Sequence, residues 1–114
     1  MKYAYAALLT ALMISSTALA QNDCATAIPI TAGIFVVDTV DGAQIPQPVC
    51  ASGGNTATNG EWYTYTPTAN YSLVVTTDLA ENTGLDTRVH VYTGTCGNLV
   101  CFDGDDDAGS GYLS

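Results

Sequence analysis

The stretch "TRVHVYTG" (Thr87–Gly94), followed after a short turn by "NLVCF" (Asn98–Phe102), decides the fold class of this chain. Both segments are rich in β-branched or apolar residues, and the first alternates its side chains with a period of two. The intervening "TGTCG" has the glycines and small polar residues of a turn. The two segments are therefore predicted to form a β-hairpin.

The alternation also assigns the faces of the first segment, because successive side chains of a strand point in opposite directions. Val89 and Val91 share one face and are expected to point to the core, whereas Arg88, His90 and Tyr92 share the other. His90 is the only histidine of the sequence and has no obvious catalytic partner. A solvent-facing or edge-strand position is therefore favoured for it.

The rest of the chain after residue 20 shows no helical periodicity, so the pattern predicts an all-β protein. Two further strands, "EWYTYTP" (Glu61–Pro67) and "YSLVVTT" (Tyr71–Thr77), are separated by a tight turn and are expected to pair as a hairpin. "GIFVVDTV" (Gly33–Val40) is a third candidate strand. The long connection of residues 41–60 is rich in Gly, Pro, Asn and Ser, and Cys50 is expected to tie it back.

Residues 1–20 are predicted to be a signal peptide rather than part of the fold. Lys2 supplies a positive start, Ala4–Ile14 is an apolar run, and Ala18–Ala20 offers a cleavage site. The apolar run is shorter than the roughly 20 residues that span a membrane. Since Gln21 and not a cysteine follows the cleavage site, a lipid anchor is not expected. Residues 21–114 are then one domain at most.

The charge of the chain is strongly acidic, with eleven Asp and Glu against two Lys and Arg and a net charge of −9. Nucleic acids and anionic membrane surfaces attract basic proteins, so neither is an expected partner. Such a balance suits a secreted protein, or one that neutralises part of its charge with a metal ion.

The four cysteines, an even number in a short exported chain, are predicted to form disulfides. Four cysteines allow three pairings. Cys24–Cys50 with Cys96–Cys101 is the favoured one, because both bonds close local loops. A zinc site is the less favoured alternative, since "C-x4-C" with a single histidine is a poor zinc pattern.

The stretch "DGDDDAG" (Asp103–Gly109) crowds four carboxylates together, and their repulsion requires solvent, turn hydrogen bonds or a cation to offset it. Asp103, Asp105 and Asp107 have the one-three-five spacing of calcium loops. Together with Asp86 they are the candidate calcium ligands. The later positions do not match an EF-hand, and a solvated turn that calcium does not occupy remains the alternative.

Aromatic residues provide a second candidate site. Trp62, Tyr63 and Tyr92 are candidate binding residues, in a set of aromatic side chains that could form a platform for sugar rings or collagen. The alternative is that these rings fill or cover a small β-sandwich. No catalytic constellation occurs in the sequence, so enzymatic activity is not expected.

Three separated stretches, "QNDCATAIPI" (residues 21–30), "GEWYTYTPTANYSLVVTT" (60–77) and "LDTRVHVYTGTCGNLVCFDGDDDAGSG" (85–111), resemble the bacterial pre-peptidase C-terminal (PPC-type) domain family. The resemblance implies a jelly-roll-like antiparallel β-sandwich that is secreted, non-catalytic and attached to or beside enzymes or adhesins. Some members of the family bind collagen or polysaccharides, and some of these use calcium, so the resemblance implies a ligand of this kind.

The sequence departs from the family pattern at three places. Glu61 stands where Asp is usual, Arg88 and His90 replace apolar or small residues, and the strands that follow the acidic turn in the family are absent. The chain is therefore expected to be the N-terminal part of an incomplete sandwich.

Together these features predict a secreted bacterial accessory module of a larger extracellular protein. It is expected to bind polysaccharide or a matrix protein, with calcium as an assisting ion. The alternative is a structural spacer or folding aid for an adjacent secreted peptidase or hydrolase domain, and a catalytic fragment is the weakest hypothesis. The expected partners are further domains of the same polypeptide and an extracellular ligand, with no membrane span after signal cleavage.

Overall fold

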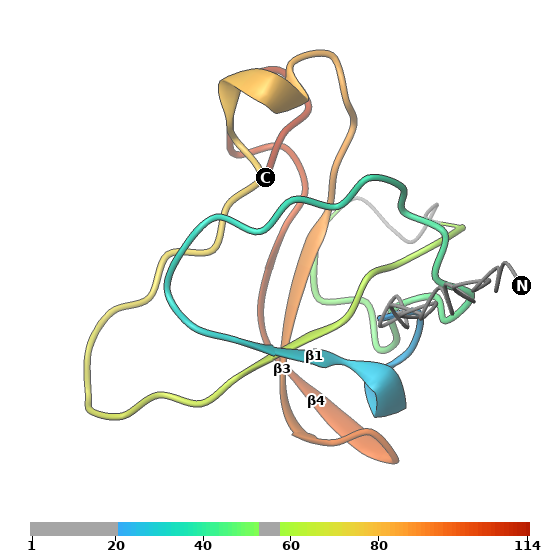
Figure 1. Cartoon of the computed structure of the whole chain (residues 1–114), viewed down its shortest axis with the longest axis vertical. Coiled ribbons are helices and arrows are strands. Elements are labelled where there is room, and N and C mark those ends of the chain that lie inside the picture. The colour runs from blue at the N-terminus through green and yellow to red at the C-terminus, as the bar shows by residue number, and fades with distance from the viewer. Residues whose placement is uncertain (1–20, 53–57) are drawn as a thin grey trace, which may run out of the picture.

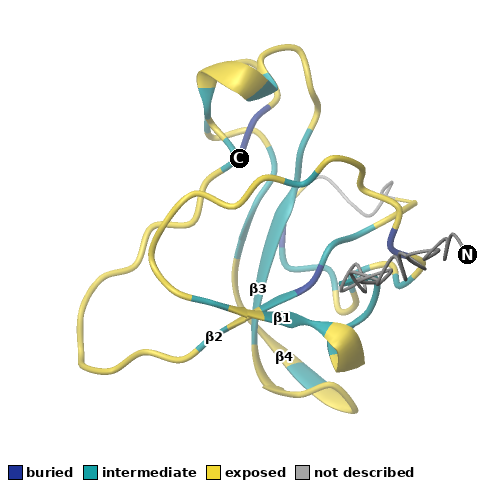
Figure 2. Ribbon diagram, in the orientation of Figure 1, coloured by how far each residue is buried: buried dark blue, intermediate teal, exposed yellow. Residues whose placement is uncertain are grey.

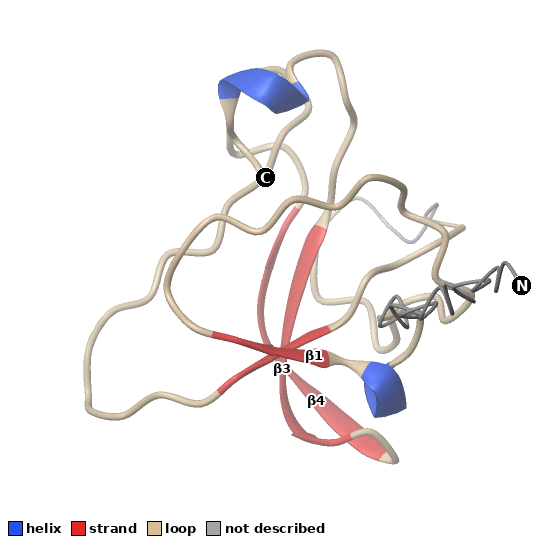
Figure 3. Cartoon of the chain, viewed as in Figure 1, coloured by secondary structure: helices blue, strands red, loops and turns tan. Residues whose placement is uncertain are grey.

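The computed structural model describes residues 21–52 and 58–114, so the predicted signal peptide lies outside the described residues. The chain forms two small sheets joined by long loops (Figures 1 and 3), which agrees with an all-β protein. A jelly-roll sandwich is not evident in two sheets of two strands each. The elements are the 3-10 turns η1 (Cys24–Thr26) and η2 (Ala80–Asn82) and the strands β1 (Ile28–Ile30), β2 (Tyr63–Tyr65), β3 (Val89–Thr95) and β4 (Asn98–Asp105).

The predicted hairpin near the C-terminus is confirmed. Strands β3 and β4 pair antiparallel, with Thr95 opposite Asn98 across the turn. The register shifts midway, because Val91 faces Asp103 and Tyr92 faces Cys101. Phe102 is the extra residue of the resulting β-bulge, and its side chain is exposed.

The hairpin predicted for residues 61–67 and 71–77 is wrong. Strand β2 instead pairs in parallel with β1, from Ile28 opposite Tyr63 to Ile30 opposite Tyr65. The N–H of Trp62 donates to the carbonyl of Gln21 at 2.9 Å and extends this contact. Neither 33–40 nor 71–77 forms a strand, although both are described. Sequence alternation indicates an extended segment but does not identify the neighbour that supplies its hydrogen bonds.

All four cysteines form disulfides, but the predicted pairing is wrong. The bonds are Cys24–Cys96 and Cys50–Cys101. A Cys96–Cys101 bond is incompatible with the hairpin, because Cys96 lies in the turn while Cys101 faces Tyr92 on β3. That separation is about four residues, or about 13 Å along a strand, and a disulfide spans at most about 7 Å between Cα atoms.

The interior is small and lies on an unexpected face. Apart from glycine, the buried residues in the described part of the chain are Ala51, Trp62, Leu113 and Ser114. Val89 and Val91, expected in the core, are only half-buried. The ring of Trp62 stacks instead on Tyr92, from the face of β3 that carries the polar residues, at a centroid distance of 5.8 Å. Figure 2 shows that the loops around this centre are largely exposed.

Residues 48–51, here called the crossing segment, pass over the β3–β4 pair at Gly104. A Cβ atom added at Gly104 would lie 2.5 Å from the backbone nitrogen of Ala51. The Cys50–Cys101 bond and a 2.6 Å hydrogen bond from the hydroxyl of Tyr92 to the carbonyl of Pro48 fasten the segment there. The prediction that Cys50 ties this connection back to the fold is therefore confirmed.

The disulfide connectivity is open to a direct test. Non-reducing proteolysis followed by mass spectrometry should yield Cys24 linked to Cys96 and Cys50 linked to Cys101. Removal of either bond by paired Cys→Ser substitution is expected to cost about 4 kcal/mol, because each closes a long loop. A peptide in which Cys96 and Cys101 are bonded to each other would contradict the structure.

The close crossing at Gly104 predicts a position-specific effect of an added methyl group. Gly104→Ala should lower the free energy of unfolding by about 1–3 kcal/mol, since the crossing segment would have to move. Gly97→Ala is the matched control, because no atom lies within 4 Å of a Cβ at that turn glycine. Equal denaturation midpoints for the two variants would show that the crossing segment is not tightly packed on β4.

Candidate functional site

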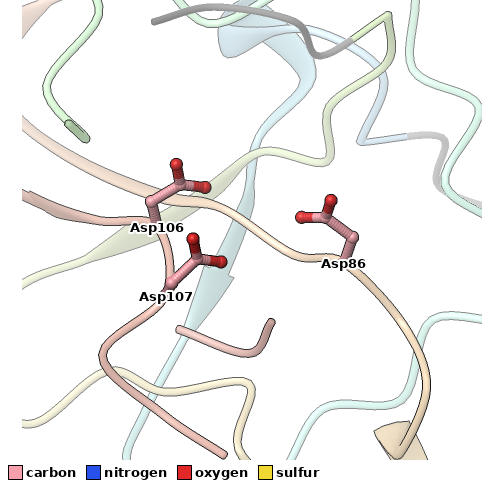
Figure 4. A group of neighbouring side chains, drawn as sticks. All are labelled: Asp86, Asp106 and Asp107. Atoms are coloured by element: carbon pink, nitrogen blue, oxygen red, sulfur yellow. The ribbon is translucent and has the colours of Figure 1, made fainter. Parts of the chain in front are cut away.

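The candidate metal site is a cluster of three carboxylates, Asp86, Asp106 and Asp107. One oxygen from each lies within 4.8 Å of the others. Asp86 comes from the loop before β3, and the other two follow β4 directly, so the hairpin brings them together (Figure 4). Their side chains point into a common space.

The end of the described chain holds this cluster in place. Asp86 forms an isolated parallel bridge with Tyr112, and the N–H of Thr87 donates to the carbonyl of Tyr112 at 2.9 Å. The buried hydroxyl of Ser114 lies 2.8 Å from the carbonyl oxygens of both Thr87 and Asp106. The loop before β3 and the turn after β4 are therefore both joined to residues 112–114.

Arg88 neutralises one member of the cluster. Its Nε donates to Asp106 Oδ1 at 2.7 Å and its Nη2 to Oδ2 at 2.8 Å, a bidentate pair. Both side chains are largely buried, with 14% and 13% of their surface exposed. The hydrogen bond to Asp106 raises the pKa of Arg88 above its usual value. The pairing with Asp106 was not predicted, although Arg88 is the only Lys or Arg in residues 21–114.

The pKa of Asp107 shows the effects of desolvation and of the crowded carboxylates. Desolvation, and then the carboxylates of Asp106 and Asp86, raise the pKa of Asp107 above its usual value. A bound cation would act in the opposite direction, because it stabilises the ionised form of nearby carboxylates.

The predicted calcium ligands are only partly brought together. Asp86 and Asp107 lie in the cluster, whereas Asp103 and Asp105 do not. The side chain of Asp103 accepts from the N–H of Gly104 at 2.8 Å, and that of Asp105 accepts from Ala108 at 3.1 Å. Asp103 therefore bonds within β4, and only Asp105 bonds to the turn that follows the strand. The one-three-five spacing does not bring the three aspartates to one site, since Asp103 and Asp105 lie within β4 whereas Asp107 follows it and lies in the cluster.

The donor set fits calcium only in part. Calcium takes about six to eight oxygen ligands, and carboxylates are the commonest of them. The cluster supplies three carboxylates, one already engaged by Arg88. Water or backbone carbonyls would have to complete the shell.

The three predicted binding aromatics do not form one open platform. Trp62 is only 7% exposed, and its indole Nε1 donates to the carbonyl of Gln44 at 3.2 Å. Tyr92 stacks between Trp62 and His90. The rings of Trp62 and Tyr92 therefore pack in or against the interior, which agrees with the alternative that the aromatic rings fill or cover the fold. Burial raises the pKa of Tyr92.

Tyr63 lies apart from that stack, since it follows Trp62 and points to the opposite side of the strand. Its hydroxyl accepts from Gln21 Nε2 at 2.6 Å, and its ring lies 6.3 Å from that of Phe35. The hydroxyls of Tyr65 and Tyr71 contact each other. Burial, and then the charge of Glu61, raise the pKa of Tyr63. Phe35 and Tyr71, the partners of Tyr63 and Tyr65, are about half exposed.

The edge-strand position predicted for His90 is confirmed, because β3 and β4 form a two-stranded sheet, but its ring is not fully solvent-facing. Its Nδ1 accepts from the N–H of Cys50 at 3.0 Å and from that of Ala51 at 3.3 Å. Burial lowers the pKa of His90 below its ordinary value, and the charge of Arg88 adds to this effect. No sequence signal pointed to this contact, because it joins residues 40 positions apart.

A shallow hollow of about 320 Å³ lies between the region of η2 and residues 110–113. Its main acidic group, Asp78, already accepts from the N–H and the hydroxyl of Ser110 at 3.0 and 3.1 Å. Leu79, Leu85, Tyr112 and Leu113 supply most of its apolar lining. The hollow therefore lacks the converging polar groups of a reactive site.

The pairing of Arg88 with Asp106 predicts a calcium-dependent effect of its removal. Arg88→Gln should lower the free energy of unfolding by about 2 kcal/mol, because Asp106 is left without its partner. Millimolar calcium should then raise the melting temperature of this variant more than that of the wild type. Adding Asp107→Asn to Arg88→Gln should abolish the calcium effect, whereas adding Asp103→Asn should preserve it. A calcium response that depends equally on both aspartates would place the ion elsewhere.

Two further observations concern the setting of the molecule. The two disulfides indicate an oxidising, extracellular environment. Among the residues that the structure describes, no helix has the length and apolar character needed to cross a membrane.

Comparison with known proteins adds no relative: no family model, no curated protein and no solved structure matches this chain. The resemblance to the PPC-type domain family therefore stays a prediction that depends on the three sequence stretches alone.

Proposed function

We propose that this chain is a non-catalytic accessory module of a secreted protein, and that it contacts another polypeptide through two apolar segments. These are residues 33–40 and 71–75, here called the apolar segments. Their exposure is the observation that carries the proposal.

The apolar segments present aliphatic side chains to solvent. Val36 is 85% exposed and Val74 is 83% exposed, and the other exposed members are Ile34, Phe35, Val40, Tyr71, Leu73 and Val75. Monomeric proteins rarely expose contiguous apolar surface of large extent, and such surface usually marks an interaction site. In Figure 1 both segments lie in long loops that extend away from the strands on the same side.

The backbone of the apolar segments also lacks a strand partner within the described part of the chain. Among the described residues, no backbone–backbone hydrogen bond involves residues 33–40 or 71–75. Extended segments with free N–H and C=O groups can accept an added strand from a partner. This combination suits a polypeptide better than a polysaccharide, which offers neither aliphatic side chains nor a complementary backbone.

Two kinds of polypeptide fit this surface. A matrix protein would make the chain a binding module, whereas an adjacent domain of the same protein would make it a spacer or folding aid. Phe35 and Tyr71 are accessible rings within the same segments. They support polysaccharide binding as a second candidate, because aromatic rings stack on sugars.

Calcium enters the proposal as an assisting ion at the cluster of Asp86, Asp106 and Asp107. The cluster joins the loop before β3 to the turn after β4. An ion there would stiffen the hairpin base without contacting a ligand held by the apolar segments.

The proposal predicts retention of the protein on immobilised collagen, with weaker retention on chitin and cellulose. The double variant Val36→Asp with Val74→Asp should reduce retention at least about tenfold, because it places carboxylates in the apolar contact. Val100→Asp is the matched control, since Val100 is exposed on β4 and outside the apolar segments. Chelator should weaken binding less than the double substitution does.

The alternatives give different outcomes. Retention on chitin or cellulose alone would favour the polysaccharide candidate. Absence of retention on all three supports would favour the spacer. Equal retention of the double variant and the Val100→Asp control would show that the apolar segments are not the contact surface.

A further inference from the structure

His90 lies where the crossing segment passes over the β3–β4 pair. It faces Gly104 on β4, and the crossing segment passes close to this glycine. The imidazole Nδ1 accepts two backbone hydrogen bonds, from Cys50 and from Ala51. Ala51 is among the most buried residues of the described chain, with 4% of its surface exposed. A single ring nitrogen therefore satisfies two neighbouring N–H groups of the crossing segment.

This arrangement requires a neutral imidazole. When Nδ1 accepts, the ring proton resides on Nε2. A second proton on Nδ1 would remove the acceptor and direct an N–H group at two other N–H groups. The added charge would find no compensation at the other nitrogen, because Nε2 is buried and has no hydrogen-bond partner among the described residues.

We propose that His90 is a pH-sensitive latch, which holds the crossing segment on the β3–β4 pair when its ring is neutral and releases the segment when its ring is protonated. The inference does not depend on the partner proposed for the apolar segments.

The charges around His90 act in opposite directions. Burial and the guanidinium of Arg88, which directly precedes β3, favour the neutral ring, whereas Asp106 favours the charged one. Asp103 and Asp105 flank Gly104 on β4, and Tyr92 stacks on the ring at 6.2 Å. The crossing segment itself has no charged side chain, and its only cysteine is in a disulfide.

The sign of the pH effect follows from the direction of the pKa shift. The pKa of His90 is lowered in the folded chain from its ordinary value of 6.5. The latch is therefore fully effective above that value and is lost as the pH falls below it through the folded pKa. Release is local, since the Cys50–Cys101 bond and the hydrogen bond from Tyr92 to Pro48 remain.

Amide hydrogen exchange on the full chain, measured by NMR, tests the latch. Protection of the Cys50 and Ala51 amides, corrected for intrinsic exchange, should fall about tenfold between about pH 7.5 and about pH 5 in the wild type. His90→Asn is the matched variant, because Asn Oδ1 can accept in place of Nδ1 but does not titrate. Its protection at both amides should stay constant over the same range.

Two outcomes would overturn the latch. One is unchanged protection of both amides in the wild type over this range. The other is an equal fall in the wild type and in His90→Asn, which would assign the effect to the carboxylates.

A second measurement needs no variant. The ring carbons of His90 and the amides of Cys50 and Ala51 should titrate with the same midpoint below pH 6.5. The fluorescence of Trp62, the only tryptophan, should change with that midpoint, because its ring stacks on Tyr92 beside His90. Amide shifts that do not follow the ring titration would overturn the proposal.

Discussion

The covalent bond between Cys50 and Cys101 is the constraint on which the rest of this structure depends. It brings a loop with no regular secondary structure against the β3–β4 pair, and the absence of a side chain at Gly104 allows the two backbones to approach. Once the crossing segment is there, its N–H groups need acceptors, because buried donors without partners are costly. His90 Nδ1 accepts from two of these N–H groups, the hydroxyl of Tyr92 donates to the carbonyl of Pro48, and Trp62 stacks on the ring of Tyr92.

Polar contacts and disulfide bonds stabilise this fold, whereas a larger domain would be stabilised mainly by a hydrophobic core. Among the described residues no side chain is fully buried, and two disulfides join segments 72 and 51 positions apart. Each long loop closure restricts the unfolded chain strongly. At the base of the hairpin, the hydroxyl of Ser114 and the Arg88–Asp106 pair join the residues before β3 to those after β4.

Because the core is small, the apolar segments stay exposed to solvent. This exposure is the basis of the proposed role. The apolar segments have the composition of strands but have no backbone partner among the described residues. A partner polypeptide that paired with them would bury aliphatic side chains and satisfy backbone groups together. The acidic cluster and the His90 contact lie outside the apolar segments, so the proposed partner surface involves other residues than they do.

Local pattern was sufficient for features that depend on neighbours in the sequence. The hairpin of β3 and β4 and the all-β character were predictable, because alternation and turn residues act over a few residues. The involvement of every cysteine in a disulfide followed from their even number in a short chain. The nearness of Asp86 to Asp107 follows from the same hairpin, which brings the residues before β3 next to those after β4. The hairpin even excluded the favoured cysteine pairing, since it separates Cys96 from Cys101. The pairing of β1 with β2, the true disulfides, the burial of Trp62 and the role of His90 could not be predicted. Each joins segments tens of residues apart, and which distant segments meet is decided by the tertiary fold, which satisfies their hydrogen bonds and packing together.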